Sequence, residues 1–362
     1  MIAPSRNLSS QFLFTGLLLA SLAPLVRAED EIRFLDRDSK GVVTVMANIE
    51  QESIDGLRFR LGARTETVDV PVFDLVDVLY GVPGSLRLVL SRARSEEQRS
   101  NALDLTSQDR LAALDRAIKE FEHLLIQGEQ LAPAAARRQW RFHIARLKAQ
   151  AAAEDPKRAK AAVEALTSFL QQGDSWQTDA AANLLARVLT LEGNPERAAE
   201  AFRKWTNGKG TSPEVKREFA RQAILWDVLA RNFKQATQTL AALKPGTPAA
   251  TGEAVQLQAL EHFLTAAEGK PEKALGDLDV LETSAKEDSD RGHIWLIRGQ
   301  CEVLAGRDDR AFWAFLRVDQ MCRENQFARA RAVEQLVRLF EGRSDWPKAA
   351  FYRCKLWRDF SG

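Results

Sequence analysis

The chain has 362 residues, of which 45% are hydrophobic, and its 51 Lys and Arg against 50 Asp and Glu give a formal net charge of +1. This length is sufficient for a small domain followed by a longer array. Because charges of both signs are mixed along the sequence, it lacks the basic stripe typical of nucleic-acid-binding proteins and the basic clusters that hold anionic membranes, so we expect neither partner.

Residues 1–28 have the pattern of a secretory signal peptide. Arg6 provides the positive start, residues 12–26 form an uncharged apolar run, and Val26-Arg27-Ala28 precedes an acidic stretch that begins at Glu29. The apolar run is shorter than the ~20 residues that cross a membrane, and no cysteine near the cut offers a lipid anchor. We therefore expect cleavage after residue 28, no stable membrane anchor afterwards, and a periplasmic or secreted protein, with a retained N-terminal anchor as the alternative.

Residues 29–82 form the second segment, a predicted small antiparallel β domain. Short β-rich or alternating stretches are separated by turn residues, and a period of two is typical of strands with one buried face. The candidate strands are 42–45, 57–61, 67–72 and 76–80. Four or five strands in so short a segment indicate an SH3-like or open barrel. Such a domain is marginal alone, so we expect it to pack on the first helices.

Residues 83–362 are predicted to be helical, because the β pattern breaks at Gly81-Val82-Pro83-Gly84 and apolar residues then recur at helical spacing. Proline stands at several helix starts, where its missing N–H costs nothing. The predicted helices form seven pairs: 86–101 with 107–127, 133–153 with 156–171, 176–191 with 195–207, 212–230 with 233–243, 251–267 with 271–285, 290–305 with 308–323, and 326–341 with 346–360.

A similar turn recurs along this helical region. In one copy, Trp295 and Gly299 share a face of the first helix, Gly306 ends that helix, and Ala311 and Phe315 form the buried stripe of the second. The alanine that marks the turn recurs at positions 159, 198, 236, 274, 311 and 349. A period of roughly 38 residues predicts a helical solenoid, in which each helix pair covers the apolar face of the previous one.

The stretch from Trp295 to Phe315, WLIRGQCEVLAGRDDRAFWAF, resembles the tetratricopeptide repeat (TPR), and residues 185–202 are similar to it. The pattern is degenerate, because Glu302 stands where the family usually has Tyr, Arg323 stands where it often has Pro, and the period exceeds the family's ~34 residues. The resemblance implies a mainly α fold: a right-handed α-α solenoid of TPR-like hairpins preceded by a small SH3-like β domain.

The order of segments is similar to that of many bacterial envelope proteins with a signal peptide, a short β domain and degenerate TPR helices. This resemblance implies an extracytoplasmic protein that interacts with other proteins, and it brings no enzymatic activity with it. We accordingly divide the chain into a signal peptide at 1–28, a β domain at 29–82 and a helical-repeat domain at 83–362.

The sequence offers no constellation of residues that would carry chemistry. The histidines, His123, His143, His262 and His293, lie on different predicted helices without a partner at ligand spacing, although His123 and His143 could approach each other. Phosphate-binding, dinucleotide-binding and nucleophile-elbow glycine patterns are missing. We therefore expect no catalytic residue, no cofactor, no metal site and no enzyme. Cys301, Cys322 and Cys354 are expected to be buried free thiols, with a Cys322–Cys354 contact left open.

A few residues are candidates for contacts with a partner. Trp313 is offset from the buried stripe of its helix, so it either meets the next repeat or stands on the concave face as an anchor. The arginine pairs Arg137 with Arg138 and Arg329 with Arg331 could hold a carboxylate, or they could be ordinary solvated residues.

We expect a binding scaffold that holds a peptide or a partner protein in the concave groove of the solenoid, with no covalent step. Two alternatives stay open. One is an enzyme or enzyme accessory acting on envelope polysaccharide, for which the discriminating observation is a deep pocket that holds a carboxylate with a raised pKa. The other is a structural protein that assembles with itself.

Overall fold

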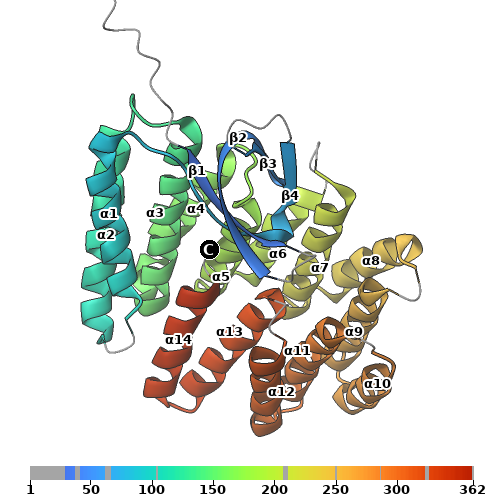
Figure 1. Cartoon of the computed structure of the whole chain (residues 1–362). Coiled ribbons are helices and arrows are strands. Elements are labelled where there is room, and N and C mark those ends of the chain that lie inside the picture. Colours follow the sequence, from blue (N-terminus) through green and yellow to red (C-terminus); the bar gives the residue numbers. More distant parts are fainter. Residues whose placement is uncertain are drawn as a thin grey trace, which may run out of the picture.

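The computed structural model describes residues 29–36, 41–61, 67–102, 105–206, 211–248, 251–285, 287–322 and 326–360. In these ranges it contains a five-stranded sheet and fourteen α-helices, arranged as a curved helical array with the sheet lying across one edge of it (Figure 1). The predicted signal peptide lies outside the described residues. Among the helices described, none is both long enough and apolar enough to cross a membrane.

The sheet is wholly antiparallel, with strand order β4-β3-β2-β1-β5. Its strands are β1 (Asp30–Asp36), β2 (Gly41–Ser53), β3 (Gly56–Arg60), β4 (Thr67–Pro71) and β5 (Leu75–Leu79), with a 3-10 turn at Val72–Asp74. The long β2 pairs with β1 through its first half and with β3 through its second, and a register shift at Ile49/Gln51 bends it between them. The first strand was not among the candidate strands, and closure into an SH3-like barrel stays a prediction.

The helices confirm the predicted repeat array. They are α1 (Gly84–Ser100), α2 (Ser107–Gln127), α3 (Ala134–Glu154), α4 (Ala159–Gln171), α5 (Thr178–Leu191), α6 (Pro195–Thr206), α7 (Pro213–Leu229), α8 (Phe233–Leu243), α9 (Gly252–Ala267), α10 (Pro271–Ser284), α11 (Asp288–Leu304), α12 (Asp308–Met321), α13 (Gln326–Gly342) and α14 (Trp346–Phe360). The largest difference is before α4, where Pro156–Arg158 form a 3-10 turn rather than the first α-helical turn.

The recurring turn forms the hairpin junction that the sequence predicts. Ala198, Ala274 and Ala311 are fully buried at the start of the second helix of their pairs. A Cβ atom at Gly299 would lie 2.7 Å from ring carbons of Phe315, so only glycine allows α11 and α12 to approach this closely. Gly306 has a φ of +71°, the left-handed conformation that ends α11 without a steric cost.

The first helices of successive pairs form an inner layer. Direct contacts run from α3 to α5, from α7 to α9, and from α9 through α11 to α13. The second helices α8, α10 and α12 lie on the outside of the array (Figure 1). This layering is expected of stacked hairpins, because each inner helix must cover the apolar faces of its neighbours.

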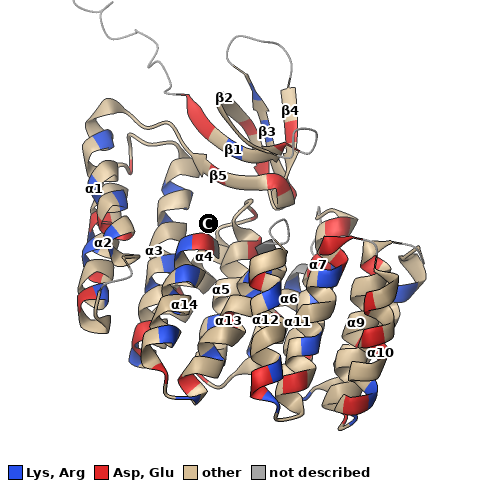
Figure 2. Ribbon diagram, turned by 60° about the horizontal axis from the view of Figure 1, so that its bottom comes forward, with Lys and Arg blue, Asp and Glu red and all other residues tan. Residues whose placement is uncertain are grey.

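The sheet packs over the N-terminal ends of inner helices, as Figure 2 shows from the side. The Gln139 side chain at the start of α3 donates to the backbone carbonyl of Val78 in β5. The Trp176 indole donates to the Tyr80 hydroxyl at 3.3 Å, and the backbone N–H of Ser212 donates to the Asp55 carboxylate at 2.9 Å. Three inner helices are thereby tied to one sheet, which confirms that the β domain is supported by the helices.

The array also folds back on itself. Arg353 in α14 pairs with Glu154 at the end of α3 at 3.1 Å, although 199 residues separate them. Trp357 belongs to the same apolar cluster as Phe142 of α3 and Trp226 of α7. The last helix pair therefore occupies part of the concave side, and what remains of the predicted groove is a chamber.

Candidate functional site

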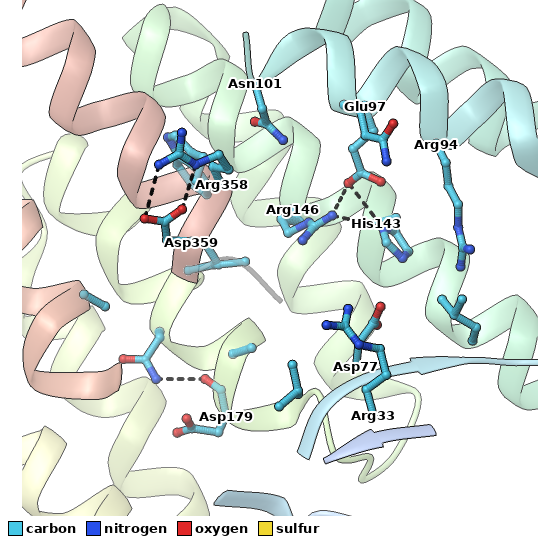
Figure 3. Close-up of a pocket in the computed structure, with 18 of the residues that line it drawn as sticks. Arg33, Asp77, Arg94, Glu97, Asn101, His143, Arg146, Asp179, Arg358 and Asp359 are labelled. Carbon is cyan, nitrogen blue, oxygen red and sulfur yellow. Dashed lines mark hydrogen bonds and ion pairs between the residues drawn. The ribbon is translucent and has the colours of Figure 1, made fainter. Parts of the chain in front are cut away.

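The chamber lies inside the array, between its first helices, its last helices and the sheet. Its volume is about 580 Å³, and its walls come from α1, α3, α5, α13 and α14 together with β1 and β5 (Figure 3). The charged and titratable side chains that line it are Arg33, Asp77, Arg94, Glu97, His143, Arg146, Asp179, Arg187, Arg358 and Asp359. A chamber with five arginines and four acids is a polar binding site rather than an apolar ligand pocket.

One wall holds a closed ionic cluster between α1 and α3. Glu97 pairs with Arg146 and, at 3.2 Å, with Nδ1 of His143. Burial would raise the pKa of Glu97, but the positive charge of Arg146 and then the interaction with His143 outweigh it and hold this pKa at about 2. The ring of Phe121 stacks on His143, with centroids 4.8 Å apart. The cluster ties α1 to α3 on this wall, and both of its contacts use the Oε1 atom of Glu97.

Two arginines of the lining have no such partner. Arg33 projects from β1 and Arg94 from α1, and among the described residues neither makes a hydrogen bond or an ion pair. By contrast, Arg358 at the end of α14 is paired with its neighbour Asp359 at 2.7 Å. The chamber thus presents two guanidinium groups whose hydrogen-bonding capacity the protein does not use.

Asp179 stands on the first turn of α5 and borders the chamber. Burial raises its pKa to about 7, and repulsion by Glu218 adds to this, while Arg331 acts in the opposite direction. None of the described side chains donates a hydrogen bond to its carboxylate. A carboxyl group that is partly neutral near pH 7 can donate as well as accept a hydrogen bond.

Behind Asp179, three arginines surround one carboxylate. Glu334 of α13 lies 3.1 Å from Arg331, 2.9 Å from Arg338 and 3.5 Å from Arg187 of α5. Arg331 also packs over the Trp226 ring at 4.4 Å, and burial lowers its pKa to about 10. This hub joins α5 to α13, so it helps to set the width of the chamber.

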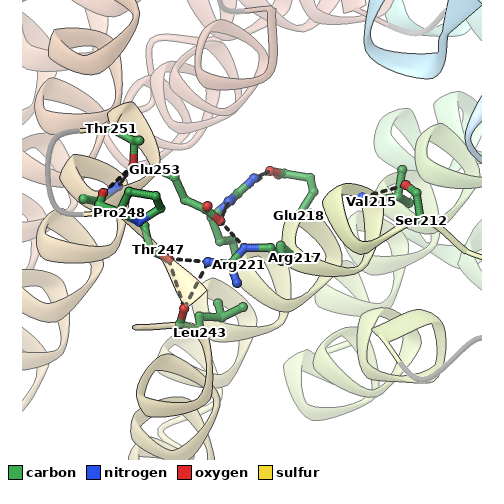
Figure 4. A network of polar contacts seen from close by, with 11 residues as sticks. Ser212, Val215, Arg217, Glu218, Arg221, Leu243, Thr247, Pro248, Thr251 and Glu253 are labelled. Carbon is green, nitrogen blue, oxygen red and sulfur yellow. Dashed lines mark hydrogen bonds and ion pairs between the residues drawn. The ribbon is translucent and has the colours of Figure 1, made fainter. Parts of the chain in front are cut away.

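A second polar network holds α7 and α9 together further along the inner layer (Figure 4). Glu253 accepts from Arg217 at 2.7 Å and from Arg221 at 2.5 Å, and Arg221 also binds Glu218 at 2.6 Å. The space beside it is only about 30 Å³, and burial lowers the pKa of His293 there to about 4. This network is structural, because the space beside it holds no more than about one water molecule.

The structure does not bring the sequence-predicted partner residues together. Trp313 is 66% exposed on α12, on the outer layer, with its ring edge-on to Phe312. At the start of α3, Arg137 donates to the Glu129 carbonyl at 2.8 Å, and Arg138 pairs with Glu52 of β2 at 3.2 Å.

The second arginine pair faces inward. Arg329 donates to the backbone carbonyl of Asp319 at 3.1 Å and lies 3.7 Å from its carboxylate, whereas Arg331 belongs to the buried hub described above. Whether any of these five residues contacts a partner stays a prediction.

The sequence analysis did not single out the residues that line the chamber, although the sequence carries a signal for some of them. Asp179, Asn183 and Arg187 recur every four residues on α5, a helix otherwise rich in Ala, Leu and Val. Such spacing puts all three on one face, so a polar stripe on an apolar helix indicates an inner surface that meets something other than core.

The cysteines are buried free thiols, as predicted. Burial raises the pKa of Cys301 to about 12 and that of Cys322 to about 11, which makes both poorly reactive. In the part of the chain that is described, no group of three or more His, Cys, Asp or Glu is arranged to hold a metal ion.

The fold and the chamber define the class: a helical-repeat protein of TPR-like hairpins with an N-terminal antiparallel sheet. No protein-family model and no curated protein matches the chain. Among solved structures, a tetratricopeptide repeat protein from Parabacteroides merdae is 12% identical, with 76% of this chain and 93% of that one covered and a TM-score of 0.39. A Rap protein complexed with competence and sporulation factor is 16% identical, with 75% and 78% covered and a TM-score of 0.38.

The TPR domain of P58(IPK) is 13% identical, with 72% of this chain and 66% of that one covered and a TM-score of 0.24. All three TM-scores lie below 0.5, so the assignment to TPR-like hairpins rests on the helices of this chain, and the functions of these proteins do not transfer to it.

Proposed function

We propose that this protein is a binding scaffold that takes a peptide, or a segment of a partner protein, into the chamber. The observation that carries the proposal is the chamber itself: about 580 Å³ on the inner face, lined by charged side chains of which Arg33 and Arg94 have no hydrogen bond or ion pair among the described residues. A volume of this size falls in the range typical of ligand sites, and inner faces of helical repeats are suited to extended chains.

Recognition in such a chamber needs no covalent step. Inner-layer helices hold the lining side chains in place, so a ligand segment meets a preorganised surface and loses less entropy than on a mobile one. Arginines supply directional donors, and backbone groups of the ligand can bind Asn183 and Gln98.

We further propose that the scaffold acts outside the cytoplasm. The support is the sequence of residues 1–28, in which Arg6, an apolar run and an acidic stretch after Ala28 follow the order of a signal peptide. Expression of the full chain in a bacterium, followed by fractionation and N-terminal sequencing, should give a periplasmic or secreted protein that begins at Glu29. An intact N-terminus in the cytoplasmic fraction would contradict this.

A photo-cross-linking experiment tests the binding function. A photoreactive amino acid at Gln98, which lines the chamber, should attach to a discrete partner or peptide in cells that make the protein. The same amino acid at Lys160, exposed on α4 outside the chamber, serves as the control and should give no such product. Equal labelling from both positions would show that the chamber is not the binding site.

One observation favours a second candidate, an enzyme or enzyme accessory acting on envelope polysaccharide. Asp179 is a carboxyl group with a raised pKa in a cavity, which is the property of a general acid. The other lining acids are engaged: Asp77 accepts from the Val78 N–H at 2.8 Å, and Glu97 and Asp359 are in ion pairs. Because the other three lining acids already have a hydrogen-bond donor or an ion-pair partner, no second carboxyl group is left to act with Asp179, and binding is the better supported function.

Incubation with envelope polysaccharide separates the two candidates. If the protein is an enzyme, new reducing ends should appear with wild type and fall by about a hundredfold or more in Asp179→Asn, in keeping with the loss of a general acid. If it is a scaffold, neither protein should release any.

A further inference from the structure

A second hollow adjoins the chamber along α1. It measures about 500 Å³ and is lined by Arg87, Leu90, Ser91, Arg94, Ser95 and Gln98. Arg94 and Gln98 also line the chamber, so the hollow and the chamber meet at these two residues. We call the face of α1 formed by these six residues the α1 groove.

We propose that an acidic peptide segment lies along the α1 groove and enters the chamber at Arg94, where its carboxylates bind the arginines of both spaces. This inference rests on the binding function proposed above, and it adds the charge of the ligand and its route.

The charge of the α1 groove supports an anionic ligand. Its lining contains Arg87 and Arg94 but no Asp or Glu, and neither arginine has a hydrogen bond or an ion pair among the described residues. The hydroxyl groups of Ser91 and Ser95 are likewise unbonded there. Ionised carboxylates only accept hydrogen bonds, so they suit a surface that offers donors and has no acid of its own. Guanidinium groups can bind a carboxylate with two parallel hydrogen bonds.

The chamber continues this pattern. Among the described residues, Arg33 on the β1 wall makes no side-chain hydrogen bond or ion pair, and Arg187 on the α5 wall holds its buried Nε atom 3.5 Å from Glu334. Arg187 shares the carboxylate of Glu334 with Arg331 and Arg338. Of these three arginines, Arg187 lines the chamber, so this wall presents a further guanidinium group to a ligand.

Among the described residues, no group donates a hydrogen bond to the carboxylate of Asp179, and this acid does not oppose the ligand at moderately acidic pH. It faces Glu218 of α7 and Arg331 of α13, and burial together with Glu218 raises its pKa to about 7. Below that pH the neutral carboxyl group can donate a hydrogen bond to a ligand carboxylate. Above it, Asp179 is charged and repels the ligand, so affinity should fall as pH rises through about 7.

The length of the groove sets a minimum length for the segment. Residues 87 to 98 span roughly 16 Å along a helix axis, which corresponds to about five extended residues. A segment that also reaches Arg33 or Asp179 therefore needs about eight or nine residues, whereas a single acidic residue or a free carboxylate should bind weakly.

A pool of random nonapeptides, incubated with the immobilised protein and identified by mass spectrometry, tests the proposal. Peptides retained by wild type should carry an excess of Asp and Glu over the input pool. Arg94→Gln should lower their retention about tenfold or more, since a hydrogen-bonded charge pair contributes roughly 1.5–3 kcal/mol. Arg92→Gln is the matched control, because Arg92 stands on the same helix and lines neither space.

The outcomes separate this proposal from the binding function. Retained peptides without an acidic excess would overturn the proposal and leave the binding function standing. Acidic peptides retained equally by wild type, Arg94→Gln and Arg92→Gln would overturn the proposal that the peptide lies along the α1 groove and enters the chamber at Arg94. A pool from which nothing is retained would overturn both. Because Arg94 makes no hydrogen bond or ion pair among the described residues, circular dichroism should show Arg94→Gln to be folded.

Discussion

The buried hub around Glu334 gives the sharpest stability prediction. Glu334→Gln keeps the shape and much of the hydrogen bonding of the side chain but removes the negative charge that Arg187, Arg331 and Arg338 share. Burial would raise the pKa of Glu334, and the three arginines outweigh burial and hold this pKa at about 2, against 4.5 for a free glutamate. A difference of this size corresponds to roughly 3 kcal/mol of folding free energy.

The pH dependence follows from the sign of the shift. Because the pKa is lowered in the folded state, the contribution of Glu334 is complete above about pH 4.5 and is lost as the pH falls toward about 2. The difference between wild type and Glu334→Gln should therefore be constant from pH 8 to pH 5 and shrink at lower pH.

Hydrogen–deuterium exchange of α13 is the assay, since it reads the free energy of local opening without requiring two-state unfolding of the whole array. Glu334→Gln should speed exchange in α13 roughly a hundredfold at pH 7. The control is Glu261→Gln, which breaks an exposed pair with Lys244 and should change exchange by no more than about threefold. An effect of Glu334→Gln as small as that of the control would refute the reasoning.

Four further substitutions test other parts of the account. In urea unfolding, Gly299→Ala should destabilise the protein by about 1–3 kcal/mol, because the added Cβ meets the ring of Phe315. Gly276→Ala should instead stabilise it by about 0.5–1 kcal/mol, because the added Cβ on α10 meets open space. Asp179→Asn should raise the melting temperature at pH 8, by the equivalent of roughly 1–3 kcal/mol, and leave it unchanged near pH 4, because the raised pKa makes only the ionised form costly. Trp313→Ala should alter the free energy of unfolding by less than about 1 kcal/mol, because the side chain is exposed. If Trp313 anchors a partner as predicted, the substitution should also reduce cross-linking of that partner. Unchanged cross-linking would show that Trp313 is not part of the interface.

The local parts of the fold were predictable because their causes are local. The alanines at 198, 274 and 311 lie at hairpin junctions because a small residue must stand where two helices cross, and a turn glycine such as Gly306 precedes the third of them. These requirements act within about twenty residues, so they leave a periodic mark in a single sequence.

The sequence carries no periodic signal for the closure of the array, in which α14 returns to α3. The pair between Glu154 and Arg353 joins residues 199 apart, and each looks like an ordinary solvated charge in the sequence. The same holds for Arg331, which was grouped with Arg329 as a possible surface contact and lies buried against Trp226. Burial of a charge depends on which helices meet across the concave side, and that depends on the curvature summed over many repeats.

The chamber exists only because α14 returns to α3, so the most direct test of the account is a double-mutant cycle on the pair that joins them. Glu154→Gln, Arg353→Gln and the double variant should be compared by exchange-derived opening free energies of α14. Because the Glu154 side chain is only 1% exposed, we predict a coupling energy of about 1–3 kcal/mol. Effects that add to within about 0.5 kcal/mol would contradict the closed array.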